Sequence, residues 1–362
     1  MNSEGKLALT GLSKAALEAR LEAAGEPGYR AAQILDWIYA KRVTSFEQMT
    51  NLSQGLRRIL EDSFTLCCLE EAGVRGLEDV TRKYLFRLGD GRFVETVLIP
   101  ASPALYGESS ERRTLCVSSQ VGCAYGCKFC ASGLAGFARD LEVAEIVEQV
   151  ILVERLSGER VNNLVFMGMG EPLANFERVL AAIGIINASW GLGIGARRMT
   201  ISTSGLAPEI RLLADQPLQI RLAVSLHGVT DEVREAIMPV NRKYPLEELF
   251  AALRYFRTRK KQRITFEYIL IEGVNDHHDD ARGLVRSAQE VSAKVNLIPY
   301  NLVDGLDWKR PGRGRQDAFF AVLQEAGIPA TLRREKGGDI DAACGQLRLQ
   351  TEAAVTQRGA IS

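Results

Sequence analysis

Residues 114–133 read TLCVSSQVGCAYGCKFCASG, and the interpretation of the whole chain starts from them. The first part, Thr114–Val117, is a short apolar run of the kind that forms a buried strand. The second part places Cys123, Cys127 and Cys130 in a C-x3-C-x2-C spacing. A strand that leads directly into a thiol-rich loop predicts a ligand-binding loop at the strand's carboxyl end.

The three clustered thiols favour an iron–sulfur cluster. Soft thiolate ligands stabilise iron, and three ligands for four irons leave one iron open to bind another molecule. A structural zinc site would need a fourth ligand, usually from a second C-x2-C pair, and the sequence has no such pair. The alternative, that the three cysteines are only buried small hydrophobes, is disfavoured by their spacing.

Beyond this stretch, short apolar runs alternate with amphipathic helical patterns. Such alternation predicts βαβ units and a parallel sheet, and about six repeats of the unit favour an open or partial β/α barrel over a doubly wound sheet. The expected strands are Thr114–Val117, Asn163–Met167, Met199–Ser202, Ile220–Leu226, Ile264–Ile271 and Val295–Pro299. The expected helices are 142–156, 174–188, 207–213, 231–237, 245–260 and 278–291.

Polar or glycine-rich motifs follow these expected strands. Barrel sites are assembled at the carboxyl ends of strands, so we expect the motifs to converge on one face. They are MGMGEP at 167–172, TISTSG at 200–205, SLH at 225–227, Gly273–Asp276 and Tyr300–Asn301.

The chain before residue 114 divides into two parts. Residues up to about 70 show the helical periodicity of apolar side chains, beginning with Leu17 and Leu21. Residues 81–100, TRKYLFRLGDGRFVETVLIP, change to two β-rich runs around Gly-Asp-Gly and predict a hairpin. We therefore expect a helical domain at 1–72, a hairpin linker at 73–105, a core at 106–350 and a tail at 351–362.

The composition is that of an ordinary globular protein, with 46% hydrophobic and 25% charged residues. Lys+Arg and Asp+Glu both number 45, so a nucleic-acid surface would have to come from local clusters of charge. Three basic clusters are candidates: Arg254–Arg263, Lys309–Arg315 and residues 333–336. The N-terminal residues lack the apolar region of an export signal, so we expect a cytoplasmic protein with no membrane partner.

Longer stretches of the chain carry a family resemblance. TLCVSSQVGCAYGCKFCASG, FMGMGEPLAN, TISTSG, SLH, VNLIPYN and GGDIDAACGQL together resemble the RlmN/Cfr family of radical S-adenosylmethionine (SAM) RNA adenine methyltransferases. The similarity runs from roughly residue 25 to residue 348. It implies a partial (β/α)6 radical SAM barrel in the core, with the helical domain as an RNA-binding accessory.

The resemblance also implies a cofactor site. Cys123, Cys127 and Cys130 would ligate one 4Fe–4S cluster, whose open iron binds SAM. Seven residues at the strand ends match the SAM-contacting positions of the family: Gly170, Glu171, Ser202, Ser225, Leu226, His227 and Asn301.

Three further residues carry the chemistry that the resemblance implies. Cys344 would be methylated by one SAM and pass the methyl group to RNA, while a second SAM supplies a radical. Cys116 would release the protein–RNA adduct and leave a Cys116–Cys344 disulfide. Glu95, on the hairpin's second strand, would accept the ring proton. Taken alone, both thiols are more typical of inert packing, and Glu95 of a solvated carboxylate.

The family's substrates define the expected reaction. We expect methylation of carbon 2 of an adenosine in the peptidyl-transferase region of 23S rRNA, and of an adenosine beside the tRNA anticodon, with an external electron donor such as flavodoxin. A Cfr-type enzyme, which methylates carbon 8 of the same rRNA adenosine, is the near alternative. A non-catalytic RNA-binding module with a structural metal is the remote one.

Overall fold

The computed structural model describes residues 5–76, 81–101, 110–134, 136–302 and 306–333. The chain forms two compact units. The first comprises residues 1–121, 139–168 and 175–199, and the second comprises 122–138, 169–174 and 200–362. This division differs from the consecutive domains expected from the sequence, because the chain passes between the units several times. Within the described residues no helix is both long and apolar enough to cross a membrane.

The first unit begins with the expected helical part. Its helices are α1 (Lys14–Ala23), α2 (Arg30–Tyr39) and α3 (Gln54–Ser63), and short helical turns cover Leu9–Gly11 and Phe46–Gln48. Ser13 and Ser53 cap α1 and α3 by accepting backbone N–H bonds from Ala16 and Leu56. Strand β1 (Leu7–Ala8) pairs in parallel with β2 (Phe64–Thr65), so the two ends of this helical part lie together.

The same unit contains a mixed sheet with strand order β9-β6-β5-β4-β3. Its strands are β3 (Leu69–Arg75), β4 (Arg82–Leu88), β5 (Phe93–Pro100), β6 (Arg113–Cys116) and β9 (Asn163–Phe166). The expected hairpin is confirmed as β4 and β5, closed at a left-handed Gly91. Helix α6 (Val143–Ser157) is buried along most of its length, and α7 (Phe176–Asn187) packs against it.

Strand β3 was not expected, since the sequence places residues up to 72 in the helical part. Only Leu69 of this strand is buried, and the other residues are exposed or half-buried. Such an edge strand has no apolar periodicity for sequence reasoning to detect. The helical part therefore ends at Ser63, before the expected boundary at 72.

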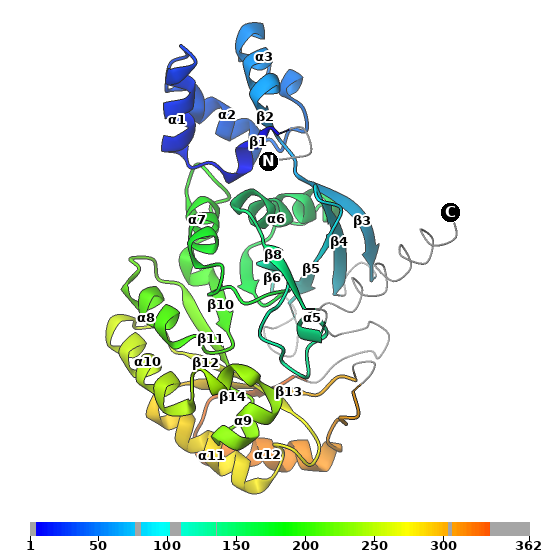
Figure 1. The fold of residues 1–362 in the computed structure, drawn as a ribbon, viewed down its shortest axis with the longest axis vertical. Helices are drawn as coiled ribbons and strands as arrows, with labels where there is room; N and C mark the ends of the chain where they lie inside the picture. The colour runs from blue at the N-terminus through cyan, green and yellow to red at the C-terminus, as the bar shows by residue number, and fades with distance from the viewer. Residues whose placement is uncertain (1–4, 77–80, 102–109, 135, 303–305, 334–362) are drawn as a thin grey trace, which may run out of the picture. The chain divides into compact units, whose positions relative to one another are not determined.

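The second unit contains a parallel sheet with strand order β10-β11-β12-β13-β14. The strands are β10 (Met199–Thr203), β11 (Arg221–Ser225), β12 (Thr265–Leu270), β13 (Lys294–Pro299) and β14 (Ala330–Leu332). Between them come α8 (Ala207–Asp215), α9 (Asp231–Ile237), α10 (Leu246–Arg259), α11 (His278–Glu290) and α12 (Arg313–Glu325), coloured green to orange in Figure 1. The expected strands and helices of this region are confirmed to within about two residues, which is the usual scatter at element ends.

Side chains divide between the two faces of this sheet. Phe266 of β12 contacts Phe250 of α10, and Tyr268 of β12 contacts Phe319 of α12, so this face is covered by helices. Because successive side chains of a strand alternate, Glu267 points to the opposite face. That opposite face is where the polar residues of the strand ends gather.

The basic stretch Lys309–Arg315, which we expected to be a loop, is only partly one. Helix α12 begins at Arg313, and Gly312 is its N-cap residue in an extended conformation. Phe319 and Leu323 give the helix a buried apolar face, which outweighs the weak helix propensity of Gly314.

Two small elements frame the cysteine loop. Strands β7 (Gln120–Gly122) and β8 (Phe137–Asp140) pair as a ribbon, and the one-turn helix α5 (Ala131–Leu134) lies between them in sequence. Another helical turn covers Ala196–Arg198 ahead of β10, and a further one covers Pro239–Arg242 after α9.

Candidate active site

The cysteine loop lies between β7 and α5 in the second unit. Cys123 donates its backbone N–H to the carbonyl of Gly136 at 2.9 Å, which closes the base of the loop. Gly122 precedes it with a φ of +78°, and a Cβ there would lie 1.9 Å from the Gly136 carbonyl oxygen. Only glycine fits this position. Further along, Lys128 donates its backbone N–H to the carbonyl of Ile237 at 3.0 Å, which fixes the loop to the end of α9.

The three loop thiols are half-buried, and Cys123 and Cys127 each lie in the electrostatic field of neighbouring thiols. Burial raises the pKa of Cys123 to about 12. Burial, and then the neighbouring Cys130 and Cys123 thiols, raise the pKa of Cys127 well above its ordinary value. Cys123 and Cys127 are therefore protonated when no ligand is bound, and a metal would displace these protons.

This donor set suits a cluster better than a single ion. No group of three or more His, Cys, Asp or Glu within the described ranges is placed to hold one metal ion. A four-iron cluster takes one thiolate per iron, so its ligands need not converge on one point. Three neighbouring soft donors on one partly exposed loop fit a 4Fe–4S cluster held by Cys123, Cys127 and Cys130.

His227 follows β11 and contacts the cysteine loop through Phe129. The two rings meet edge to face, with centroids 4.7 Å apart. His227 Nδ1 accepts the backbone N–H of Ile269 at 3.1 Å, so the ring proton of the neutral imidazole is on Nε2. Burial, and then the nearby positive charge of Arg234, lower the pKa of His227 to about 3. His227 is therefore uncharged near pH 7 and packs against the cysteine loop, and it does not act as an acid or a base at that pH.

Gly170 and Glu171 follow β9 and belong to the second unit. Gly170 has a φ of +98°, a conformation that favours glycine. The buried Glu171 carboxylate accepts the backbone N–H of Leu173 at 3.0 Å and that of Ser204 at 2.6 Å. Burial raises its pKa. Glu171 thus ties its own loop to the loop after β10, in addition to any contact with the ammonium group of a ligand.

Ser202 and Ser225 lie on the polar face of the parallel sheet. Ser202 pairs with Ala223, two residues before Ser225, so the two hydroxyls are diagonal neighbours on one face. Leu226, unlike these two serines, offers no polar side chain to a ligand, and its side chain is fully buried. Its backbone N–H donates to the carbonyl of Glu267. Leu226 therefore shapes the loop through its backbone.

A row of polar residues continues from Ser225 across the neighbouring strands. Ser225 is in register with Glu267, Glu267 with Asn296, and Asn296 with Thr331. Asn296 donates to Glu267 at 3.0 Å and accepts from Thr331. Glu267 is buried within this row, between Ser225 and Asn296, and burial raises the pKa of its carboxyl group. The sequence motifs included Ser225 but did not reveal the row, because its four members lie on four different strands.

Asn301 follows β13 and is half-buried. Arg310 donates to its side-chain oxygen, and also to the carbonyl of Tyr300 at 2.8 Å. Arg310 was expected as an RNA-binding residue of a basic loop, but its guanidinium is engaged in shaping the Asn301 loop. The basic stretch 254–263 is similarly engaged in part, with ion pairs from Arg254 to Glu290 and from Arg259 to Asp215.

Glu95 and Cys116 both lie in the first unit, on neighbouring strands of its sheet. Cys116 of β6 is in register with Val97 of β5, and Glu95 is two residues from Val97 on the same face. Thr96 points to the other face, where its hydroxyl donates to Gln149 of α6 at 2.7 Å. Both Glu95 and Cys116 are buried, at 2% and 5% exposure. The carboxyl and the thiol are therefore diagonal neighbours on the face away from α6. Cys344 lies outside the described residues.

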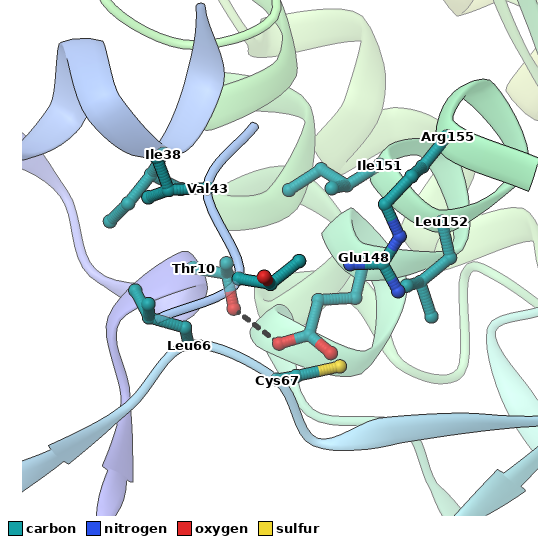
Figure 2. Close-up of a pocket in the computed structure, with 10 residues that line it drawn as sticks. Thr10, Ile38, Val43, Leu66, Cys67, Glu148, Ile151, Leu152 and Arg155 are labelled. Carbon is teal, nitrogen blue, oxygen red and sulfur yellow. Dashed lines mark hydrogen bonds between the residues drawn. The ribbon is translucent and has the colours of Figure 1, made fainter. Parts of the chain in front are cut away.

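A small cavity of about 200 Å³ lies in the first unit, around Glu148. Figure 2 shows the Glu148 carboxylate directed toward Thr10 and Cys67. The carboxylate accepts the Thr10 hydroxyl at 2.7 Å and the backbone N–H groups of Cys68 and Leu69 at 2.7 and 3.1 Å. These three donors satisfy the buried carboxylate, so it joins the N-terminal helical part to α6. Sequence reasoning gave no role to Cys67 and Cys68, and the structure places them at this junction.

Family comparisons agree with this arrangement. Residues 7–66 match the ribosomal RNA large subunit methyltransferase N-terminal domain, and residues 117–285 match the radical SAM superfamily. The chain is 53% identical over 344 residues to a probable dual-specificity RNA methyltransferase RlmN of Akkermansia muciniphila, covering 95% of this chain and 96% of the relative. It is 48% identical over 327 residues to the protein of the same description in Bacillus subtilis, covering 90% and 88%.

A solved structure shows the same likeness. The crystal structure of a radical SAM methyltransferase from Sphaerobacter thermophilus superposes with a TM-score of 0.87 at 43% identity, covering 94% of this chain and 98% of the other. This confirms the fold class expected from the sequence, an α/β radical SAM core preceded by a helical domain.

Proposed function

The chain belongs to the RlmN family of radical SAM RNA methyltransferases, and on that basis we propose that it methylates carbon 2 of adenosine in two RNAs. The substrates are an adenosine of the peptidyl-transferase region of 23S rRNA and an adenosine beside the tRNA anticodon. The relatives at 53% and 48% identity are described as dual-specificity RNA methyltransferases, which supports two RNA substrates.

One observation carries the radical SAM assignment. In the second unit, direct contacts connect the cysteine loop, the Gly170–Glu171 loop and the ends of β10 and β11, and Arg234 links the last two through the carbonyls of Ser204 and Leu226. The Phe129–His227 contact joins the first to the last, and the Glu171–Ser204 bond joins the middle two. A bound 4Fe–4S cluster with SAM would supply reductive cleavage of SAM to a carbon radical, which is chemistry that no side chain offers.

The remaining steps fall to residues of this chain. Carbon 2 of adenine is electrophilic, so it does not attack the methyl group of SAM directly. We assign the methyl group first to the sulfur of Cys344, from which it reaches the ring as a methylene after loss of a hydrogen atom. The radical adduct must then lose one electron, which returns to the electron-transfer partner that supplied one for SAM cleavage, and the proton of the ring carbon. Glu95 would accept that proton, which requires hydrogen-bond reach to the ring carbon.

Release of the base is assigned to Cys116. Its thiolate would attack the sulfur of Cys344 and break that sulfur's bond to the ring-bound carbon. That carbon keeps the electron pair and takes a proton to become the methyl group, and a Cys116–Cys344 disulfide remains. External thiols must reduce this disulfide before another turnover. Cys116 is diagonal to Glu95 on one buried face of the sheet, which supports a role for both groups at the same substrate. Exclusion of water from such a face strengthens the electrostatic interactions of the thiol and of the carboxyl with a substrate.

The reaction is tested by mass spectrometry of RNA from a host that lacks its own enzyme of this family. Expression of this chain should add one methyl group to carbon 2 of the rRNA adenosine and one to the tRNA adenosine. Methylation of carbon 8 would show a Cfr-type enzyme instead, and an unmodified tRNA would remove the second substrate.

Two cysteine variants test the route. Cys344→Ala should give no methylated RNA, because the methyl carrier is gone. Cys116→Ala should accumulate a covalent protein–RNA adduct through Cys344, visible as a slow band on denaturing gels. Normal turnover of the Cys116→Ala enzyme would contradict the assigned release step, even if the methylated carbon is confirmed.

A further inference from the structure

Arg234 is an arginine with no exposed surface, on α9 of the second unit. Its guanidinium makes three hydrogen bonds. Nε donates to the carbonyl of Leu226 at 3.2 Å, Nη1 to the side-chain oxygen of Asn241 at 2.8 Å, and Nη2 to the carbonyl of Ser204. A fully buried guanidinium is rare, so its position calls for a reason.

The bonds of Arg234 connect the loops that form the candidate cofactor site. Ser204 follows β10 and Leu226 follows β11, so one guanidinium joins two strand ends. The backbone N–H of Ser204 donates in turn to Glu171, which extends the connection to the Gly170–Glu171 loop. Arg234 is therefore the link between three loops that sequence reasoning treated as separate motifs.

Two glycines make room for Arg234, Gly205 beside its guanidinium and Gly228 beside its backbone. A Cβ on Gly205 would lie 2.8 Å from Nη2 of Arg234, and a Cβ on Gly228 would lie 2.7 Å from its backbone nitrogen. Both distances are shorter than the contacts that Cβ atoms make in real proteins. A larger residue at either glycine would therefore displace Arg234. The surrounding chain is thus shaped to hold Arg234.

The charge of Arg234 is not cancelled by its hydrogen-bond partners. Its three acceptors are two backbone carbonyls and an amide, all of them neutral. The nearby Asp231 carboxylate instead accepts from Asn241 at 2.8 Å and from the backbone N–H of Leu246 at 2.8 Å. Burial lowers the pKa of Arg234 to about 10, which still leaves it charged at neutral pH.

The cysteine loop lies against the same helix. Lys128, which follows Cys127, donates its backbone N–H to Ile237, three residues after Arg234 on α9. The Cys127 thiol and Arg234 interact electrostatically, since each favours the charged form of the other. The Asp231 carboxylate also acts on Arg234, and His227 lies in the field of Arg234 but is neutral.

From this arrangement we propose that Arg234 is a positioning residue of the cluster site, and that its fixed positive charge, on the helix to which the cysteine loop is bonded, raises the reduction potential of the bound cluster. The inference rests on the cluster assignment of the proposed function. A reduced cluster carries one more negative charge than an oxidised one, so a buried cation stabilises the reduced form. A higher reduction potential makes it easier for an external donor to reduce the cluster before SAM cleavage.

The test compares three variants of the whole, cluster-loaded protein. Arg234→Gln removes the charge and keeps a hydrogen-bond donor, and Arg234→Lys keeps the charge and loses the planar fork. Arg242→Gln is the matched control, because it removes an exposed arginine from the turn that follows α9. The midpoint potential of each is measured by redox titration followed by electron paramagnetic resonance, together with iron content.

We expect Arg234→Gln to lower the reduction equilibrium constant about tenfold, which for a one-electron couple is a shift of about 59 mV to more negative potential. Arg234→Lys and Arg242→Gln should stay within about threefold of the wild type, or roughly 30 mV. The cluster signal of the wild type tests the proposed function separately, since it does not depend on Arg234.

Two results would overturn the proposal. One is an unchanged potential in Arg234→Gln with normal iron content. The other is a tenfold or larger fall in Arg234→Lys, because that variant retains the charge. If Arg234→Gln takes up no iron, the Lys variant alone decides the question.

Discussion

Phe129 of the cysteine loop and His227 after β11 meet edge to face, at an interplanar angle of 88°. Phe129 lies between Cys127 and Cys130, so the contact bears directly on the cluster ligands. His227 is held in turn by the backbone N–H of Ile269 on its Nδ1 and by the side-chain amide of Asn275 on its carbonyl. The cysteine loop therefore packs against the His227 ring. Hydrogen bonds from β12 and from the segment that follows it fix the orientation of that residue.

Replacing Phe129 with Leu should loosen the cluster without unfolding the protein. An aromatic pair of this geometry contributes about 0.5–1.5 kcal/mol beyond the burial of its area, so iron loss to a chelator should accelerate by roughly threefold to tenfold. Loss is followed by the decay of the cluster's visible absorbance. Phe137→Leu, which removes an exposed ring from β8, is the control and should decay like the wild type. Equal rates in both variants would show that the ring contact does not hold the loop.

His227→Asn should remove a pH-dependent part of stability. The pKa of His227 is lowered to about 3 in the folded protein, while an unfolded histidine titrates near 6.5. The unfolded state therefore binds a proton first, and the wild type loses stability as the pH falls below 6.5. Relative to the Asn variant, the loss should reach about 2 kcal/mol at pH 5, measured by urea unfolding. Asn is suitable because it tolerates the left-handed φ of +55° at this position. A pH-independent difference between the two proteins would contradict a buried neutral His227.

Gly122→Ala should prevent cluster binding, and Gly126→Ala should not. Both glycines have positive φ, so alanine adds roughly 1–2 kcal/mol of backbone strain at either position. At Gly122 the new Cβ would also overlap the Gly136 carbonyl at 1.9 Å, whereas nothing lies within 4 Å at Gly126. The overlap must break the Cys123–Gly136 bond that closes the loop. Iron content after anaerobic reconstitution measures the outcome, and equal loading of the two variants would show that the loop base is not needed.

Glu148→Gln should preserve the junction between the N-terminal helical part and α6 while changing its response to pH. Burial raises the pKa of Glu148 above its unfolded value, so the folded state binds the proton more tightly. The wild type therefore loses stability, relative to the Gln variant, as the pH rises above about 4.5 through the raised pKa. The Gln oxygen can accept from Cys68 and Leu69, and its amide can donate to Thr10.

Thermal and urea unfolding from pH 4.5 to 8 would measure this difference. Glu177→Gln, an exposed substitution on α7, is the control for the loss of one carboxylate. A Glu148→Gln variant that grows less stable than the wild type with rising pH would reverse the expected sign. Deletion of residues 1–72, which would ask whether the helical part binds RNA, would also disrupt this network. That deletion would remove all three donors to Glu148 and leave a buried carboxylate without them.

Local sequence patterns predicted most elements that position the site. Helix α9 was expected at 231–237 and is found there, and the strands of the parallel sheet lie within about two residues of expectation. These elements could be predicted because apolar residues recur in them at the regular spacing of a helix or strand, which is visible within a short stretch of sequence. Strand β3 was missed because only one of its residues is buried, and β14 because it has only three residues. Helix α12 was missed because Gly312 and Gly314 are more typical of a loop.

The sequence by itself determined the type of chemistry, because three cysteines at fixed spacing and glycines at strand ends are local features. Only the tertiary structure decided which charged residues are buried. Arg234 and Glu148 look in sequence like the charged residues of any helix surface. Their partners come from distant segments, with Ser204 lying 30 residues from Arg234 and Thr10 lying 138 residues from Glu148. A buried charge is stable only when such partners supply its hydrogen bonds, and no local pattern records that they will.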